Sequence, residues 1–303
     1  MKKNTLTIGT RGSKLALIYA EKVKNELNKI FPNEIKLKKI VTTGDQKQDQ
    51  RLSDIGGKGL FAEQIEKELL NEDIDIAVHA LKDMPTIETE SLLTNNFLKR
   101  NSPNEILISK NNTKFEDLAP NSIIGTSSFR REFQLKKKRS DLKYKLIRGN
   151  VDTRIQKLEN GEFDAILLSK AGIDSLKLQN KITQEFSVDE LIPCAGQGII
   201  AIQCKKNDSD IIDLLEKIND IESRIVANAE REVLKVLEGD CDTAVGVFAK
   251  ITGENVDLVT ELFSVDGKMR YFIRETVKKD KIETVSRMIG EKLKLQSKGS
   301  YKN

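Results

Sequence analysis

The chain is poor in the residues that most often build metal and redox sites: its 303 residues include one histidine, three cysteines and no tryptophan. A single histidine, His79, argues against a metal site made of several imidazoles, and we expect it to be a packing residue. The cysteines Cys194, Cys204 and Cys241 form no C-x-x-C pair, so the sequence indicates neither a zinc site nor a disulfide framework. With only four tyrosines, a base-stacking surface for nucleic acid is also disfavoured.

Long apolar runs are missing as well. The first ten residues, MKKNTLTIGT, contain a basic pair but no stretch long enough for a signal peptide or a membrane span, so we expect a cytoplasmic protein without a membrane partner. The 51 basic and 47 acidic side chains leave a net charge of +4. That balance is too even for a protein that coats a nucleic-acid backbone, so we expect any basic site to be local.

The positions of the few arginines form a pattern. Lysine outnumbers arginine by 38 to 13, yet arginines recur in short turns rich in glycine, serine and threonine, between strand-like and helix-like segments. A guanidinium binds a carboxylate or phosphate as a planar two-pronged donor, whereas lysine is a flexible point charge. The pattern predicts a ligand with several carboxylates or phosphates, bound by Arg11, Arg130, Arg131, Arg148 and Arg154.

Strand-like and helix-like segments alternate from the start of the chain. The pattern predicts strands at 6–9, 35–41 and 74–78, and helices from residue 13 and over 60–70. Such alternation is typical of a mostly parallel sheet covered by helices on both faces.

The same pattern then begins again. Residues 8–13 (IGTRGS) resemble 124–130 (IGTSSFR), and residues 75–78 (DIAV) resemble 164–167 (DAIL). We therefore expect two related α/β lobes with a cleft between them. Ligands of open α/β sheets bind at the carboxyl ends of strands, where these turns would lie.

The remaining elements complete a predicted division into three domains. A hinge is expected near 99–103, and the apolar run at 199–204 is expected to cross back into the first lobe. The polar, glycine-rich stretch 44–59 is predicted to be a loop over the site. The predicted domains are a first lobe of 1–98 with 198–219, a second lobe of 102–193, and a small α+β domain of 220–303.

Two motifs resemble helix starts that bind anions. The segment GTSSFRR, 125–131, would present backbone N–H groups and hydroxyls at a helix N-terminus, where the dipole favours an anion. The alternative is an ordinary helix cap followed by solvated arginines. Because basic residues at this end oppose the dipole unless an anion is present, the anion site is favoured. The segment 148–154 repeats the arrangement, with Asp152 as a possible cap.

The segment VHALKDMPT, 78–86, would place Lys82 and Asp83 at the carboxyl end of a strand. A carboxylate beside cations stays ionised and can stabilise a developing positive charge. An aspartate turn before Pro85 is an equal alternative from the residues alone. Cys204 is expected to be a core thiol, and Cys241 lies in a glycine-flanked turn to which the residues alone assign no function.

In this order, the motifs resemble the porphobilinogen deaminase family over nearly the whole chain. They are the turn 10–13, the loop 56–61, the segments 78–86, 125–131 and 148–154, the turn 196–198 and the loop around Cys241. The expected fold class is α/β, with two periplasmic-binding-protein-like lobes around a cleft and a small C-terminal α+β domain.

The resemblance implies a transferase of porphyrin, tetrapyrrole and heme biosynthesis that acts as a monomer. It would join four porphobilinogen molecules head to tail, with loss of ammonia, into the linear tetrapyrrole hydroxymethylbilane. A dipyrromethane cofactor would be attached to Cys241 through a thioether, and Asp83 would be catalytic. Cofactor contacts are implied for Lys82, Asp83, Thr126, Ser128, Arg130, Arg131 and Arg148; contacts with the incoming substrate are implied for Arg11, Ser13, Arg148 and Arg154.

The chain departs from the family pattern at three positions. Ser175 stands where arginine is frequent, which predicts one weaker carboxylate contact or its transfer to Lys170 or Lys177. Tyr19 stands where glutamine is common, and Ala244 replaces a frequent proline.

Two other classes of protein share parts of this pattern. A two-lobed anion-binding or effector-sensing protein could use the same architecture, although a pure binder has no need of a tethered thiol. An RNA-binding module built on the basic run 136–139 is disfavoured by the small net charge, and the run is more simply a solvated helix face.

Overall fold

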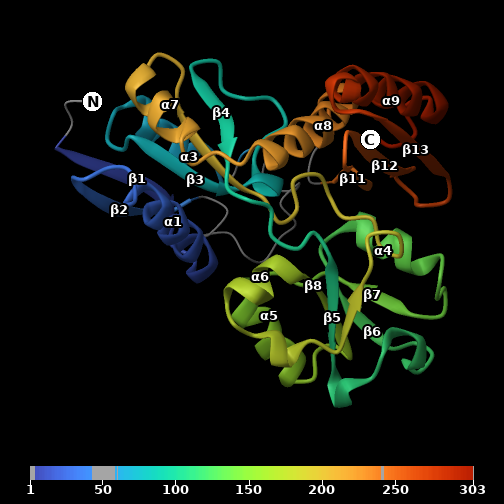
Figure 1. The fold of residues 1–303 in the computed structure, drawn as a ribbon. Helices are drawn as coiled ribbons and strands as arrows, with labels where there is room; N and C mark the ends of the chain where they lie inside the picture. The colour runs from blue at the N-terminus through green and yellow to red at the C-terminus, as the bar shows by residue number, and fades with distance from the viewer. Residues whose placement is uncertain (1–3, 43–58, 60, 240–241, 303) are drawn as a thin grey trace.

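The computed structural model describes residues 4–42, 59, 61–239 and 242–302. The expectations for Cys241 and for nearly all of the loop 44–59 therefore lie outside the described residues. Three sheets organise the rest, each with its own helices (Figure 1). Within the part of the chain that is described, no helix is long and apolar enough to cross a membrane.

The first lobe is a five-stranded sheet with helices against it. Its elements are β1 (Thr5–Arg11), α1 (Lys14–Leu27), β2 (Glu34–Ile40), α3 (Glu63–Leu70), β3 (Ile76–Ala80), the 3₁₀ turn η2 (Leu81–Asp83), β4 (Leu92–Phe97), β10 (Ile200–Lys205) and α7 (Ser209–Glu216). The strand order is β2-β1-β3-β10-β4. The return of β10 to this sheet confirms the predicted crossing back of 199–204.

The second lobe has a five-stranded sheet of its own. Its elements are β5 (Glu105–Ser109), η3 (Lys110–Asn112), η4 (Phe115–Asp117), β6 (Ile123–Gly125), α4 (Phe129–Lys136), β7 (Lys143–Lys145), α5 (Val151–Glu159), β8 (Ala165–Ser169), α6 (Lys170–Ser175), η5 (Gln179–Lys181) and β9 (Gln184–Phe186). The order β7-β6-β8-β5-β9 matches that of the first sheet position by position. The two α/β lobes predicted from the sequence are thus confirmed.

The internal repeat extends to individual hydrogen bonds. In the first lobe, Asp75 Oδ2 accepts from the backbone N–H of Thr7 at 2.8 Å. In the second, Asp164 Oδ2 accepts from the backbone N–H of Ile123 at 2.7 Å. In both lobes the aspartate ties the start of one strand to its parallel neighbour, which explains why the same short motif precedes β3 and β8.

Four of the five strands in each sheet point in the same direction, which confirms the expectation of mostly parallel sheets, but one strand in each sheet is reversed. In the first sheet β10 runs antiparallel to both β3 and β4, and in the second β5 runs antiparallel to both β8 and β9. Each of these strands enters its sheet directly from the other lobe and not through a helix that packs on the same sheet, so the parallel crossover rule does not apply to it.

Two crossover segments, 98–104 and 187–199, connect the lobes and lie side by side. The backbone N–H of Asn101 donates to Gly198 O at 2.8 Å, and Gln197 Nε2 donates to Pro103 O at 2.7 Å. Gly198 has a φ of +82°, and a Cβ there would lie 2.6 Å from Asn101 O. Only glycine allows the two crossovers to approach so closely.

The C-terminal part forms an antiparallel sheet with two long helices. Its elements are α8 (Ile221–Leu237), β11 (Val245–Thr252), β12 (Asn255–Phe263), β13 (Arg270–Lys278), η6 (Lys279–Lys281) and α9 (Ile282–Ser297). One apolar core joins Val233 of α8 and Val247 of β11 to Leu81 and Phe97 of the first lobe. The expected small α+β fold is present, while the exact domain boundaries remain a prediction.

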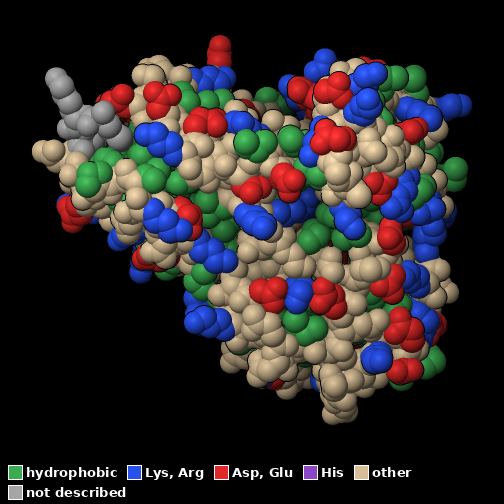
Figure 2. Space-filling view, viewed as in Figure 1, with side chains coloured by type: hydrophobic (Ala, Val, Ile, Leu, Met, Phe, Trp, Pro, Cys, Tyr) green, Lys and Arg blue, Asp and Glu red, His purple; other side chains and the backbone are tan. Residues whose placement is uncertain are grey.

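Local sequence explains where the helices begin. Ser13 caps α1 by accepting from the backbone N–H of Ala16, and Ser128 caps α4 by accepting from that of Arg131. Along α1, Tyr19, Val23 and Leu27 recur at helical spacing and are buried against the sheet. On the face seen in Figure 2, basic and acidic side chains are interspersed over the described surface, as the small net charge predicts.

We expect Gly198→Ala to destabilise the protein by about 2–4 kcal/mol, because it combines left-handed backbone strain with a clash against two carbonyls of the facing crossover. The measurement is the free energy of unfolding in urea. Gly253→Ala is the matched control: its φ is +59°, but nothing lies within 4 Å of the added Cβ, so about 1 kcal/mol is expected. Equal losses in the two variants would show that the crossover contact has no special role.

Candidate active site

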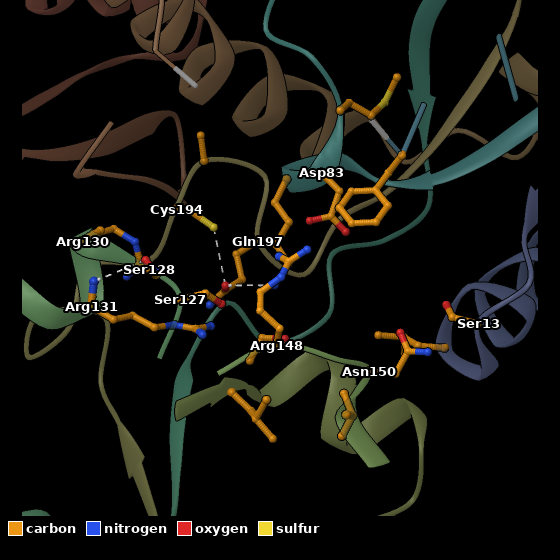
Figure 3. A pocket seen from close by; sticks show the side chains of 18 of the residues that line it. Ser13, Asp83, Ser127, Ser128, Arg130, Arg131, Arg148, Asn150, Cys194 and Gln197 are labelled. Atoms are coloured by element: carbon orange, nitrogen blue, oxygen red, sulfur yellow. Dashed lines mark hydrogen bonds between the residues drawn. The ribbon is translucent and has the colours of Figure 1, made fainter. Parts of the chain in front are cut away.

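A cavity of about 420 Å³ lies where the two lobes meet the C-terminal domain (Figure 3). Strands β1, β3 and β6 point their carboxyl ends toward it, as expected for an open α/β fold. Of the site residues predicted from the sequence, the structure brings nine together in its wall: Arg11, Ser13, Lys82, Asp83, Ser128, Arg130, Arg131, Arg148 and Arg154. Asp152, predicted as a possible helix cap, also lines the cavity, but the N-cap of α5 is Asn150.

One predicted residue, Thr126, is placed differently. Thr126 is buried behind the wall, and its Oγ1 accepts from the backbone N–H of Ser128 at 3.2 Å, so it shapes the turn before α4. Cys241 lies outside the described residues, but Gly239 and Asp242, on either side of the undescribed pair 240–241, both line the cavity.

Arg130 and Arg131 are not the solvated arginines of the alternative interpretation. Their exposed fractions are 3% and 7%. Arg130 donates to Glu105 Oε1 at 2.6 Å and to Ile192 O at 2.7 Å. Arg131 donates to Glu105 Oε2 at 2.7 Å and to Leu167 O at 3.1 Å. One carboxylate therefore holds both guanidiniums at the start of α4.

Sequence reasoning missed Glu105. It is fully buried at the first position of β5, directly after the first crossover. Burial alone would raise its pKa, but the charges of Arg131 and Arg130 outweigh burial and lower the pKa of Glu105 to about 2. An acidic residue at the start of an otherwise apolar strand, NEILIS, was the available signal.

Further along the wall, positive charge is less well compensated. Arg154 Nε donates to Gly149 O at 2.8 Å. Burial first, and then the charges of Arg131 and Arg148, lower the pKa of Arg154 to about 10, so it remains a cation at neutral pH. Guanidiniums held close enough to repel one another prepare a site for an anion with several negative groups.

Asp83 ends the turn η2 and projects into the cavity from the first-lobe side, opposite the arginines of the second lobe (Figure 3). Its charge also acts on Arg154, across the cavity. Beside it, Lys82 Nζ donates to Gln197 Oε1 at 3.4 Å, and Cys194 Sγ contacts the same oxygen at 3.6 Å. Gln197, another residue that sequence reasoning left without a role, thus joins Lys82 to the crossovers.

The structure shows the contacts made at two of the three positions that depart from the family pattern, Ser175 and Tyr19, and at Lys170. Ser175 Oγ accepts from Lys22 Nζ at 3.2 Å, so α6 of the second lobe contacts α1 of the first. Lys170 pairs with Asp174 and Glu185, at 3.5 and 3.4 Å. Burial, with the charge of Asp83 adding to it, raises the pKa of Tyr19 to about 12, so its hydroxyl stays protonated beside the site.

His79 is buried, which confirms the expectation of a packing residue. Burial lowers its pKa to about 4, so the imidazole is neutral at neutral pH. Cys204 is likewise fully buried in the core of the first lobe, as predicted.

Fold and cavity together define a class: a two-lobed α/β protein whose cationic cleft lies at the carboxyl ends of its strands. Comparison with family models then identifies the family. Residues 6–213 match the model described as porphobilinogen deaminase, dipyromethane cofactor binding domain, and residues 225–295 match its C-terminal domain. The chain belongs to the porphobilinogen deaminase family, as its motifs indicated.

Curated relatives agree with this assignment over most of their length. The chain is 42% identical over 267 residues to the porphobilinogen deaminase of Chlorobaculum tepidum, covering 88% of this chain and 86% of that one. It is 40% identical over 276 residues to the porphobilinogen deaminase of Bacillus subtilis, covering 90% and 87%.

Solved structures of bacterial binding proteins overlap the chain more weakly. A periplasmic binding protein of Salmonella typhimurium with high arginine specificity aligns with a TM-score of 0.43 and 14% identity, covering 74% of this chain and 97% of that one. A YaeC-family lipoprotein of Enterococcus faecalis aligns with a TM-score of 0.45 and 11% identity, covering 73% and 93%. At such scores the overlap adds no argument about the ligand.

We expect Glu105→Gln to lower the free energy of unfolding by roughly 3–5 kcal/mol at neutral pH, because two buried guanidiniums lose their shared counterion. The pKa of Glu105 is lower in the folded protein than in the unfolded chain. Its contribution is therefore complete above about pH 4.5 and is lost as pH falls toward 2. Urea unfolding at neutral and acidic pH measures both effects.

Glu159→Gln is the control, because Glu159 pairs with Lys181 on the surface and should cost less than about 1 kcal/mol. Two results would contradict the role assigned to Glu105, Arg130 and Arg131. One is a Glu105→Gln variant as stable as this control, and the other is a stability difference from wild type that is the same at pH 2.5 as at neutral pH.

Proposed function

We propose that this chain joins four porphobilinogen molecules head to tail into the linear tetrapyrrole hydroxymethylbilane, releasing ammonia, on a covalently attached dipyrromethane primer. The observation that carries the proposal is the meeting of five arginines and Asp83 in one cavity of a porphobilinogen deaminase family member. Each pyrrole unit has two carboxylate side chains, an acetate and a propionate. An arginine-lined cavity in a chain of net charge +4 matches such a polycarboxylate.

The residues present fit the cofactor. Among the described residues, the buried Nε of Arg131 has no hydrogen-bond partner, so the guanidinium keeps a donor for a ligand. Gly239 and Asp242 in the cavity wall support attachment at Cys241, which lies between them in sequence. We infer that the dipyrromethane carboxylates are held by Lys82, Ser128, Arg130, Arg131 and Arg148.

The cofactor, when bound, supplies the free pyrrole carbon to which the first porphobilinogen unit is joined. We infer that Arg11, Ser13, Arg148 and Arg154 bind the carboxylates of the incoming unit and orient its aminomethyl group. At that group the carbon–nitrogen bond breaks, ammonia leaves, and a carbon–carbon bond forms. Orientation of this kind can account for a large part of the rate.

Asp83 supplies the charge that the reaction needs. Loss of ammonia leaves a porphobilinogen ring with cationic character, and a fixed carboxylate close to the ring nitrogen stabilises it. The same carboxylate can assist removal of the proton that the attacked ring loses. A protein that only bound polyanions would gain nothing from a carboxylate that faces the bound anion from the opposite wall, as Asp83 does, and this supports an enzyme over the anion-binding or effector-sensing alternative.

The proposal also covers where the protein works and what it binds. We propose that the protein works as a cytoplasmic monomer whose partners are porphobilinogen and the growing polypyrrole chain, with neither nucleic acid nor a membrane involved. The interspersed surface charge supports the absence of a nucleic-acid or membrane partner, because the described residues form no broad basic area on the face seen in Figure 2.

We expect the intact mass of the purified protein to exceed the sequence mass by two porphobilinogen units less two ammonia molecules. In Cys241→Ser the excess should vanish, because a hydroxyl is a poorer nucleophile than a thiol and cannot form the thioether. Cys194→Ser, which alters a thiol that lines the same cavity, should retain it. No excess in folded wild-type protein, even after incubation with porphobilinogen, would support the anion-binding alternative instead.

We expect Asp83→Ala to lower kcat by about 10²–10⁴-fold while the cofactor mass is retained, because the carboxylate acts on the reacting ring and not on attachment. Stopped assays of hydroxymethylbilane formation, with intact mass in parallel, measure both. Asp152→Asn, in the opposite wall, is the control and should change kcat by less than about tenfold. Near-normal turnover in Asp83→Ala would remove Asp83 from the central role.

A further inference from the structure

The segment that follows Asp83 is fastened to the C-terminal domain by side-chain hydrogen bonds. Thr86 Oγ1 donates to the backbone oxygen of Gly239 at 2.7 Å, a contact between positions 153 residues apart. Arg231 Nη2 also donates to the backbone oxygens of Pro85 and Thr86, at 3.0 and 3.3 Å. Residues 85 and 86 are therefore held by hydrogen bonds to two positions of one neighbouring element.

That element is the end of helix α8. Arg231 lies in its last turns, and Gly239 follows it after Glu238, which takes the left-handed conformation. The N–H of Gly239 donates back to Leu234 O at 2.9 Å, which fixes the carbonyl that Thr86 contacts. Gly239 is consequently part of a rigid helix terminus and not of a free loop.

Beneath the Thr86–Gly239 hydrogen bond, the segment around Asp83 packs against α8 through apolar side chains. Leu81 and Met84, on either side of Asp83 in sequence, belong to the same core as Val233 and Leu237 of α8. Burial lowers the pKa of Arg231, with Glu88 at 3.9 Å opposing this. An arginine placed at such cost against two backbone carbonyls indicates that the position of this segment matters.

We propose that Thr86 is a positioning residue that fixes the separation between the Asp83 carboxylate and the end of α8, from which the cofactor segment continues. The inference rests on the proposed function. Asp83 belongs to the first lobe and the cofactor segment to the C-terminal domain, so a bond between the two sets how the carboxylate faces the reacting ring. A displacement of about 1 Å in such an arrangement can cost about 10²-fold in rate.

The test compares Thr86→Val, which keeps the shape and removes the donor, with Thr86→Ser, which keeps the donor. We expect Thr86→Val to carry the cofactor at the wild-type level by intact mass, with kcat lowered about 10–100-fold and KM for porphobilinogen within about twofold. Thr86→Ser should recover most of kcat. Thr89→Val is the matched control, since the Thr89 hydroxyl bonds to Glu66 within the first lobe, and its kcat should stay within about twofold of wild type.

Hydrogen exchange on the same proteins gives a readout that does not depend on turnover. Amides of residue 84 and residues 86–90 should exchange faster in Thr86→Val and in Arg231→Gln than in wild type and in Thr86→Ser. Unchanged kcat and exchange in Thr86→Val, or a loss in Thr86→Ser as large as that in Thr86→Val, would overturn the proposal. If wild type forms no hydroxymethylbilane, the proposed function fails, while the exchange experiment still decides whether Thr86 fixes this segment.

Discussion

A single buried carboxylate, Glu230 in α8, determines how the three parts of the molecule meet. It accepts from Arg100 Nη1 at 2.6 Å on the first crossover, from the N–H of Gly196 at 2.7 Å on the second, and from the N–H of Ala249 at 2.8 Å in β11. A fully desolvated carboxylate is tolerated only when all its partners are in place. These bonds hold the two crossovers and β11 around one charge, next to Ala195 and Gln197 of the cavity wall.

The same principle orders charge within the cavity. At the start of α4, the Glu105 carboxylate balances the charges of Arg130 and Arg131. Because Glu105 begins β5, it also links both arginines to the first crossover. Elsewhere in the second-lobe wall, Arg148 lies close enough to Arg154 for its charge to lower the pKa of Arg154. Glu105 thus fixes the geometry of Arg130 and Arg131, while the charges of Arg131 and Arg148 act on Arg154. A chain of nearly neutral composition can thus present a strongly cationic site.

The two lobes of the internal repeat contribute different side chains to the cavity. Both lobes use an aspartate before a central strand and a serine cap after a glycine turn, yet they supply different chemistry: the first lobe contributes Asp83 and the second contributes most of the arginines. Opposite charges brought to one cavity from two separate lobes are kept apart by the scaffold. Among the described residues, Asp83 therefore faces the cavity without an ion pair to a guanidinium, which suits the role proposed for it.

Elements such as α1, β1 and β3 and the chemistry of the turns could be predicted from the sequence, because the apolar period and the capping residues are local. Strands β4, β5 and β9 were not predicted. The motifs also placed Arg11, Asp83 and Arg148 in one site, since strand ends meet at one edge of a sheet. Strand direction in β5 and β10, the role of Glu105 and the bond from Thr86 to Gly239 were decided only by the tertiary structure. Each depends on which distant segments meet in space, and no residue pattern within either segment carries that information.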